Sequence, residues 1–214
     1  MKKTILAALL GCVLWSGAAL AGDGYDLIFR TGTLDAFAPG DRLEYRSHVA
    51  RDDAPDAAED ALLELALAEE GTAARLRRME DGQARPVAEF DASVGNPMAM
   101  FFLERTVRDV AEATGGSPFY IRNRIKDSLL TPRSIEATQV TWNGAAHAGQ
   151  TVTLMPFAQD KNRARLGEFA DMEIAVTVSP DVPGWYSGFI ARTPVREGAG
   201  RFFVSELSLA EVRK

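Results

Sequence analysis

The 214-residue chain has one cysteine and two histidines, and this scarcity excludes several kinds of chemistry. Cys12 lies in an N-terminal segment that we expect to be removed, so the mature protein would have neither a disulfide nor a thiolate for catalysis. His48 and His147 are far apart in the sequence and share no metal-ligand spacing with nearby carboxylates. We therefore predict no metal site and no cofactor.

Motifs for catalysis and nucleotide binding are missing as well. There is no GxSxG elbow, and Ser47 and His48 are neighbours in a predicted strand, where successive side chains point to opposite faces. No glycine-rich loop carries a P-loop lysine. The acidic loop 51–60 lacks the central glycine of an EF-hand and contains Pro55, so we interpret it as a solvated loop. Motif spacing thus predicts no catalytic residue.

Positive charge is also in short supply. The chain has 24 lysines and arginines against 30 aspartates and glutamates, which gives a net charge of −6. Removal of residues 1–21 would take away Lys2 and Lys3 but no acid, so the net charge would become −8. Nucleic-acid binding depends on cationic contacts to phosphate, so we expect no nucleic-acid partner.

The N-terminus has the three parts of a secretory signal peptide. Lys2 and Lys3 form the positive region, residues 5–15 the apolar region, and residues 19–21 (ALA) the cleavage site. We predict one exported, periplasmic globular domain over 22–214, with no transmembrane span in the mature chain. The alternative is a lipoprotein signal, because residues 9–12 (LLGC) resemble a lipobox that would anchor the protein by a lipid at Cys12.

Two groups of alternating, β-prone stretches predict a sheet. Turn signals separate these stretches at intervals of about 8–12 residues, which is typical of antiparallel strands. In the second group, a hairpin with a longer loop after Asn143-Gly144 would bring Val140 and Trp142 opposite Val152 and Leu154. We expect strands near 25–30, 43–49, 63–67, 73–79 and 85–90 in the first group, and near 139–142, 150–157, 171–178, 185–192 and 202–209 in the second.

Between these groups, residues 96–130 have the start and stop signals of two helices. Asn96-Pro97 and Ser117-Pro118 each place a capping residue before a proline, and Gly115-Gly116 separates the helices. Apolar residues recur at helical spacing in both segments. The predicted buried stripes are Met100, Leu103, Val107 and Val110, widened by Phe101 and Phe102, in the first helix, and Ile121, Ile125 and Leu129 in the second.

These patterns predict an α+β protein. We expect a curled antiparallel β-sheet or half-barrel with a two-helix hairpin (about 97–114 and 118–130) packed on its concave side or across its mouth. In an exported chain without cysteines, this order of elements resembles the half-barrel of periplasmic lipoprotein carriers of the lipoprotein-localisation-factor type. The resemblance covers most of the mature chain in element order alone, so it transfers no site residue. It implies a hydrophobic cleft under a helical lid that binds acyl chains or docks a partner.

Two sets of side chains are candidates for binding. Aromatic residues of the second strand group would contact a hydrophobic ligand if the sheet curls, with core packing as the alternative. Basic residues on the helices would dock an anionic headgroup or an acidic partner, with ordinary ion pairs as the alternative. The aromatic candidates are Trp142, Trp185, Phe189 and Phe203, and the basic candidates are Arg105, Arg108, Arg122, Arg124 and Lys126.

The sequence therefore favours a non-enzymatic cell-envelope protein that binds a hydrophobic ligand such as a lipid, or an envelope partner protein. One alternative is an exported hydrolase that uses a pair of facing carboxylates, because acids are the only plentiful catalytic groups. Another is an assembly factor whose basic helical hairpin docks on an acidic partner.

Overall fold

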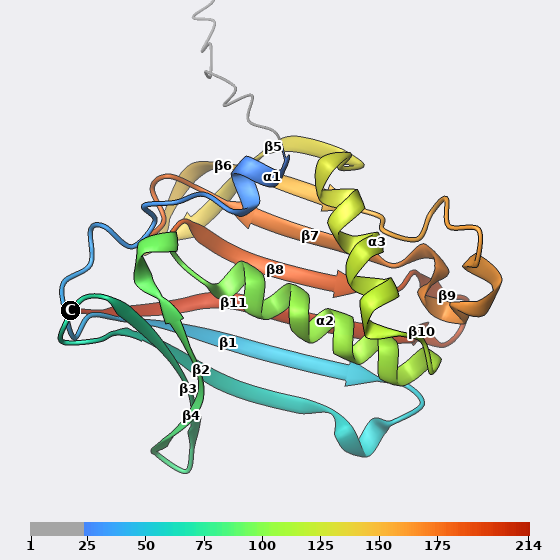
Figure 1. Cartoon of the computed structure of the whole chain (residues 1–214), viewed down its shortest axis with the longest axis horizontal. Coiled ribbons are helices and arrows are strands. Elements are labelled where there is room, and N and C mark those ends of the chain that lie inside the picture. The colour runs from blue at the N-terminus through green and yellow to red at the C-terminus, as the bar shows by residue number, and fades with distance from the viewer. Residues whose placement is uncertain (1–23) are drawn as a thin grey trace, which may run out of the picture.

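The computed structural model describes residues 24–214, so the expected signal peptide and Cys12 lie outside the described residues. A nine-stranded antiparallel sheet dominates the fold, and two helices lie across one of its faces (Figure 1). This arrangement confirms the predicted α+β class. The strands of the sheet are β1 (Arg42–Arg51), β2 (Glu59–Leu67), β3 (Ala73–Glu80), β4 (Gln83–Asp91), β5 (Ser134–Trp142), β6 (Ala145–Leu154), β7 (Glu173–Val178), β8 (Tyr186–Arg192) and β11 (Phe203–Arg213).

The strand order is β4-β3-β2-β1-β11-β8-β7-β6-β5, so two meanders are joined through the last strand of the chain. Strand β11 pairs with β1 on one side and with β8 on the other. A separate two-stranded ribbon, β9 (Val195–Arg196) and β10 (Gly200–Arg201), interrupts the chain between β8 and β11. The joint between the meanders therefore forms only when residues far apart in sequence come together.

The helices α2 (Met98–Thr114) and α3 (Pro118–Leu130) cover the inner face of the sheet, and they diverge from the turn that joins them (Figure 1). Gly115 ends α2 with a left-handed backbone (φ 63°), which a glycine adopts without strain. The Phe102 ring of α2 stacks on Phe189 of β8 with 5.3 Å between ring centroids. Ile121, Ile125 and Leu129 of α3 are buried, as predicted. Apolar packing thus holds both helices on the sheet.

Residues 25–30 were predicted to form a strand, and this prediction is wrong. The structure has a short helix there, α1 (Gly24–Ile28), with Leu27 and Ile28 buried. The indole Nε1 of Trp185 donates to the Leu27 carbonyl at 2.8 Å, and the Tyr186 hydroxyl donates to the Ile28 carbonyl at 2.5 Å. A short apolar run fits either conformation, and here distant side chains satisfy the carbonyls that end the helix.

The register predicted for the β5–β6 hairpin is also wrong. Asn143-Gly144 forms a two-residue turn with φ of 49° and 77°, rather than the start of a longer loop. This tight turn pairs Trp142 with Ala145 and Val140 with His147, whereas Val152 lies opposite Ile135. The turn type sets the register, because a two-residue connection leaves no room for another pairing.

The predicted stripe of α2 is wrong at Met100, which is 47% exposed. Phe102, Leu103, Val107 and Val110 are buried as predicted, and the stripe that packs on the sheet also includes small residues that carry no strong apolar signal. Thr106, for example, is fully buried, and its hydroxyl is satisfied because it donates to the Phe102 carbonyl at 3.0 Å. The buried set is Met98, Ala99, Phe102, Leu103, Thr106, Val107, Val110 and Ala111.

The acidic segment 51–60 is only partly a loop. Strand β1 continues to Arg51, residues Pro55–Ala57 form a 3-10 turn, and β2 begins at Glu59. Asp52 pairs with Arg196 at 2.7 Å, and Asp60 pairs with His48 at 2.8 Å. Between residues 24 and 214, no helix is both long and apolar enough to cross a membrane.

Candidate ligand-binding groove

A groove of about 340 Å³ lies between α2 and the strands β2 to β4, and we call it the α2 groove. Alternation along β2 points Glu59, Ala61 and Leu63 to the same face, towards the helix. The helix contributes a row of side chains at helical spacing from Phe101 to Glu112. The lining residues are Glu59, Ala61 and Leu63 of β2, Arg78 of β3, Val87 of β4, and Phe101, Arg105, Arg108, Asp109 and Glu112 of α2.

One end of the α2 groove is apolar. Ala61, Leu63, Val87 and Phe101 line this end, and Val87 is 44% exposed. Val87 belongs to the edge strand β4, which no further strand covers. An exposed apolar wall in a concave site favours a hydrophobic occupant, because binding would remove that wall from water.

At the other end, arginines are bound to acids. The guanidinium of Arg105 donates to the Ser47 hydroxyl at 2.8 Å and lies 3.5 Å from the Glu59 carboxylate, which Arg78 also contacts. Burial lowers the pKa of Arg105. Arg51 reaches Glu112 at 3.3 Å. These contacts tie the helix to β1 and β2.

Two side chains that line the α2 groove, Arg108 and Asp109, form no ion pair with the described residues. Arg108 is exposed and forms no ion pair or hydrogen bond with any residue of 24–214. Glu104, one helical turn earlier, is already held by two 2.7 Å bonds from Arg122. The Oδ2 atom of Asp109 is buried without a hydrogen-bond partner among the described residues. Burial raises the pKa of Asp109, and the nearby Arg105 and Arg108 oppose that rise.

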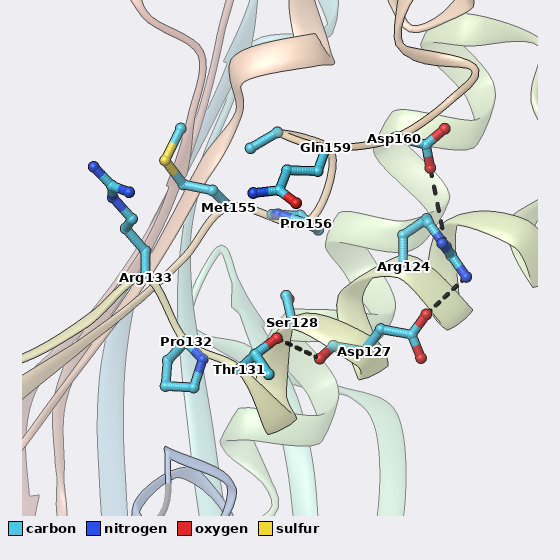
Figure 2. Close-up of a pocket in the computed structure, with 11 residues that line it drawn as sticks. Arg124, Asp127, Ser128, Thr131, Pro132, Arg133, Met155, Pro156, Gln159 and Asp160 are labelled. Atoms are coloured by element: carbon cyan, nitrogen blue, oxygen red, sulfur yellow. Dashed lines mark hydrogen bonds and ion pairs between the residues drawn. The ribbon is translucent and has the colours of Figure 1, made fainter.

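A second cavity of about 550 Å³, which we call the α3 pocket, lies between the end of α3 and the loop after β6 (Figure 2). Arg124 is held between Asp127 at 2.7 Å and Asp160 at 4.0 Å. The Tyr120 hydroxyl donates to Asp160 at 2.6 Å and accepts a bond from Asn162 at 3.0 Å. Burial alone would raise the pKa of Asp160, but the bonds from Tyr120 and Asn162 lower it overall.

The aromatic candidates do not line the α2 groove. Trp185, Phe189 and Phe203 are buried in the core, with exposed fractions of 5%, 4% and 1%. Phe203 packs on Phe169, and Arg30 lies over the ring of Trp185. Trp142 is half-buried at the turn of the β5–β6 hairpin and belongs to no part of that core. Three of the four thus belong to the buried core, where Phe189 stacks on Phe102 of α2.

The basic candidates do not form one patch. Arg105 and Arg108 line the α2 groove, and Arg124 lines the α3 pocket. Arg122 is bound to Glu104, and Lys126 is exposed. Sequence reasoning missed Val87 as a groove residue. Its only signal was its place in a predicted strand, since the approach of β4 to α2 depends on the tertiary fold.

No family model matches the chain, and no curated protein matches its sequence. Among solved structures, the lipoprotein LppX of Mycobacterium tuberculosis superposes with a TM-score of 0.39 at 9% identity, covering 89% of this chain and 95% of that chain. A beta-barrel-like protein of a domain of unknown function from Brucella abortus gives a TM-score of 0.19 at 10% identity, with coverage of 82% and 97%.

Proposed function

We propose that the protein is a non-enzymatic cell-envelope protein that binds a hydrophobic ligand in the α2 groove. The observation that carries this proposal is the exposed apolar wall of a concave site, in which Val87 is 44% exposed beside Leu63 and Phe101. The groove volume of about 340 Å³ is near the lower end of ligand sites, which span roughly 300–1,000 Å³. Such a volume suits one acyl chain better than a large folded partner.

The carboxylates of the protein support binding rather than hydrolysis. In the α2 groove, Glu59 and Glu112 are bound to arginines, which leaves Asp109 as the one acid there without a bound arginine among the described residues. Glu44 and Glu64 lie directly opposite each other on β1 and β2. They face away from the helices, however, and arginines hold both of them, including Arg42 at 3.1 Å from Glu64. A carboxylate-dependent hydrolase needs two acids free to act on one substrate.

Fluorescence of N-phenyl-1-naphthylamine, a neutral hydrophobic probe, tests the proposal. We expect the probe to bind the purified wild-type protein saturably. Its affinity for Val87→Asp should be weaker by about tenfold or more, because the variant places a charge in the apolar wall. Val195→Asp is the matched control, since Val195 is 65% exposed and lies outside the α2 groove. Absence of probe binding to the wild type, or equal binding by Val87→Asp, would contradict a ligand site in this groove.

A further inference from the structure

We infer that the α2 groove selects single-chain amphiphiles with an anionic headgroup, and that Arg108 holds that headgroup. This inference rests on the proposed function and adds the chemical class of the ligand. The groove is apolar at one end and charged at the other. Phe101, Arg105 and Arg108 follow one another at spacings of four and three residues, so they lie along one side of α2.

The two walls of the groove change polarity in the same direction. From Phe101 to Arg108 the helix rises about 10 Å at 1.5 Å per residue, from the apolar end to the charged end. From Leu63 to Glu59 the strand β2 extends about 13 Å at 3.3 Å per residue, again from apolar to charged. The 3.5 Å contact between Arg105 and Glu59 fixes this alignment. An occupant with an apolar tail and a polar head therefore has one orientation in which both of its parts match the protein.

The charge at the polar end decides the sign of the headgroup. Glu59 forms ion pairs with Arg78 and Arg105, and Glu112 forms an ion pair with Arg51. Arg108 alone among the lining arginines has no hydrogen bond or ion pair with residues 24–214. A guanidinium binds a phosphate or carboxylate through charge-assisted hydrogen bonds, which are stronger than bonds between neutral groups.

Asp109 adds a second requirement to the headgroup. Its Oδ2 atom is buried without a donor in the described chain, and a buried acceptor without a donor is costly. A headgroup that carries a hydroxyl beside its anionic group would supply the donor to Asp109 while its anion faces Arg108. Phosphoglycerol has both features, so a lysophosphatidylglycerol combines the tail, the anion and the donor in one molecule.

Isothermal titration with short-chain lipids below their micelle concentrations tests the inference. The probes are lauroyl lysophosphatidylglycerol and monolauroylglycerol, which share the monoacylglycerol part and differ in the anionic phosphoglycerol group. We expect the wild type to bind the phosphate-bearing lipid about tenfold more tightly. Arg108→Gln should bring the two affinities within about twofold by weakening the anionic lipid alone, because the apolar contacts are unchanged.

Lys126→Gln is the matched control, because it removes an exposed positive charge of α3 from a position outside the α2 groove. The control should keep the full preference for the anionic lipid. Equal wild-type affinities for the two lipids, or a preference that survives in Arg108→Gln, would overturn the inference. Competition by millimolar inorganic phosphate would overturn it too, because it would indicate a site for free anions. If neither lipid nor the neutral probe binds, the proposed function itself fails.

Discussion

The α2 groove and the α3 pocket differ in how their charges are matched. In the α3 pocket, Asp160 of the loop after β6 faces Arg124 of α3 (Figure 2). Asp160 also receives bonds from Tyr120 of α3 and from Asn162, so the loop is joined to the helix. In the α2 groove, Arg108 forms no hydrogen bond or ion pair with residues 24–214. Charged groups that hold each other stabilise a contact within the protein, whereas an unmatched group beside an apolar wall is available to a ligand.

The largest expected effect comes from the apolar packing that holds α2 on the sheet and so forms one wall of the groove. Phe102 is 1% exposed and stacks on Phe189. We predict that Phe102→Ala lowers the free energy of unfolding by about 3–5 kcal/mol, because it removes buried area and leaves a cavity. Urea denaturation would measure the loss. Phe119→Ala on α3, where the ring is 70% exposed, should stay within about 0.5 kcal/mol of wild type.

The next effect is at the start of α2, where Asn96 joins three parts of the fold. Its amide nitrogen donates to the Tyr45 hydroxyl at 2.9 Å and to the Gly184 carbonyl at 2.8 Å, and its Oδ1 accepts from the Met98 amide. Gly184 permits this approach, since a Cβ there would lie 2.9 Å from the Asn96 amide nitrogen. Burial raises the pKa of Tyr45 above its ordinary range, and the hydrogen bond with Asn96 opposes that rise.

We predict that Asn96→Ala costs about 2–3 kcal/mol in urea denaturation, because it leaves buried groups without partners and removes the acceptor of the Met98 amide at the start of α2. The same variant should leave the lipid preference of the α2 groove intact, because Asn96 does not line it. A loss below about 0.5 kcal/mol would mean that water replaces all three bonds.

Local patterns were enough to predict most of the fold. The strands β2, β3 and β4 follow from alternation and evenly spaced turns, and both helices follow from their proline starts and the glycine that ends α2. The failure at residues 25–30 occurs where distant residues decide. The helix α1 is completed by Trp185 and Tyr186, which lie 158 residues beyond the carbonyls that they bind.

The site was less predictable for the same reason. Arg105 and Arg108 were identified from helix composition, but the sequence does not indicate which of them has a partner. Arg105 is bound because β1 and β2 place Ser47 and Glu59 beneath it. Arg108 forms no hydrogen bond or ion pair within the described chain, and Glu104, one turn earlier, is bound to Arg122 of the other helix. Only the tertiary fold separates a bound arginine from an available one.

A smaller effect should come from breaking the matched charges of the α3 pocket. Tyr120→Phe removes the hydroxyl that donates to Asp160, and we predict a loss of about 1–2 kcal/mol at pH 7. The pKa of Asp160 is lowered in the folded protein, so its contribution is present above its unfolded pKa of about 4. That contribution is lost as the pH falls through the lower folded pKa.

The difference between wild type and Tyr120→Phe should therefore shrink in urea denaturation at pH 3 relative to pH 7. Tyr25→Phe is the matched control, because Tyr25 is 44% exposed and its hydroxyl has no hydrogen bond within the described residues. A difference that stays constant between the two pH values would show that Asp160 does not depend on the Tyr120 hydroxyl for its lowered pKa.

The smallest effect should come from Arg122→Gln, and it tests how Arg108 becomes available. The Arg122–Glu104 pair is close to half exposed, so its loss should cost at most about 0.5 kcal/mol of stability. The variant also frees Glu104, four residues before Arg108, where a glutamate attracts an arginine by about 0.2–0.5 kcal/mol. We expect the affinity for lauroyl lysophosphatidylglycerol to fall by about twofold in isothermal titration. The double variant Arg122→Gln with Glu104→Gln should restore wild-type affinity, because no freed acid then competes for Arg108. If the double variant stays weak, Arg122 itself contacts the headgroup, and the distinction between matched and unmatched arginines is wrong.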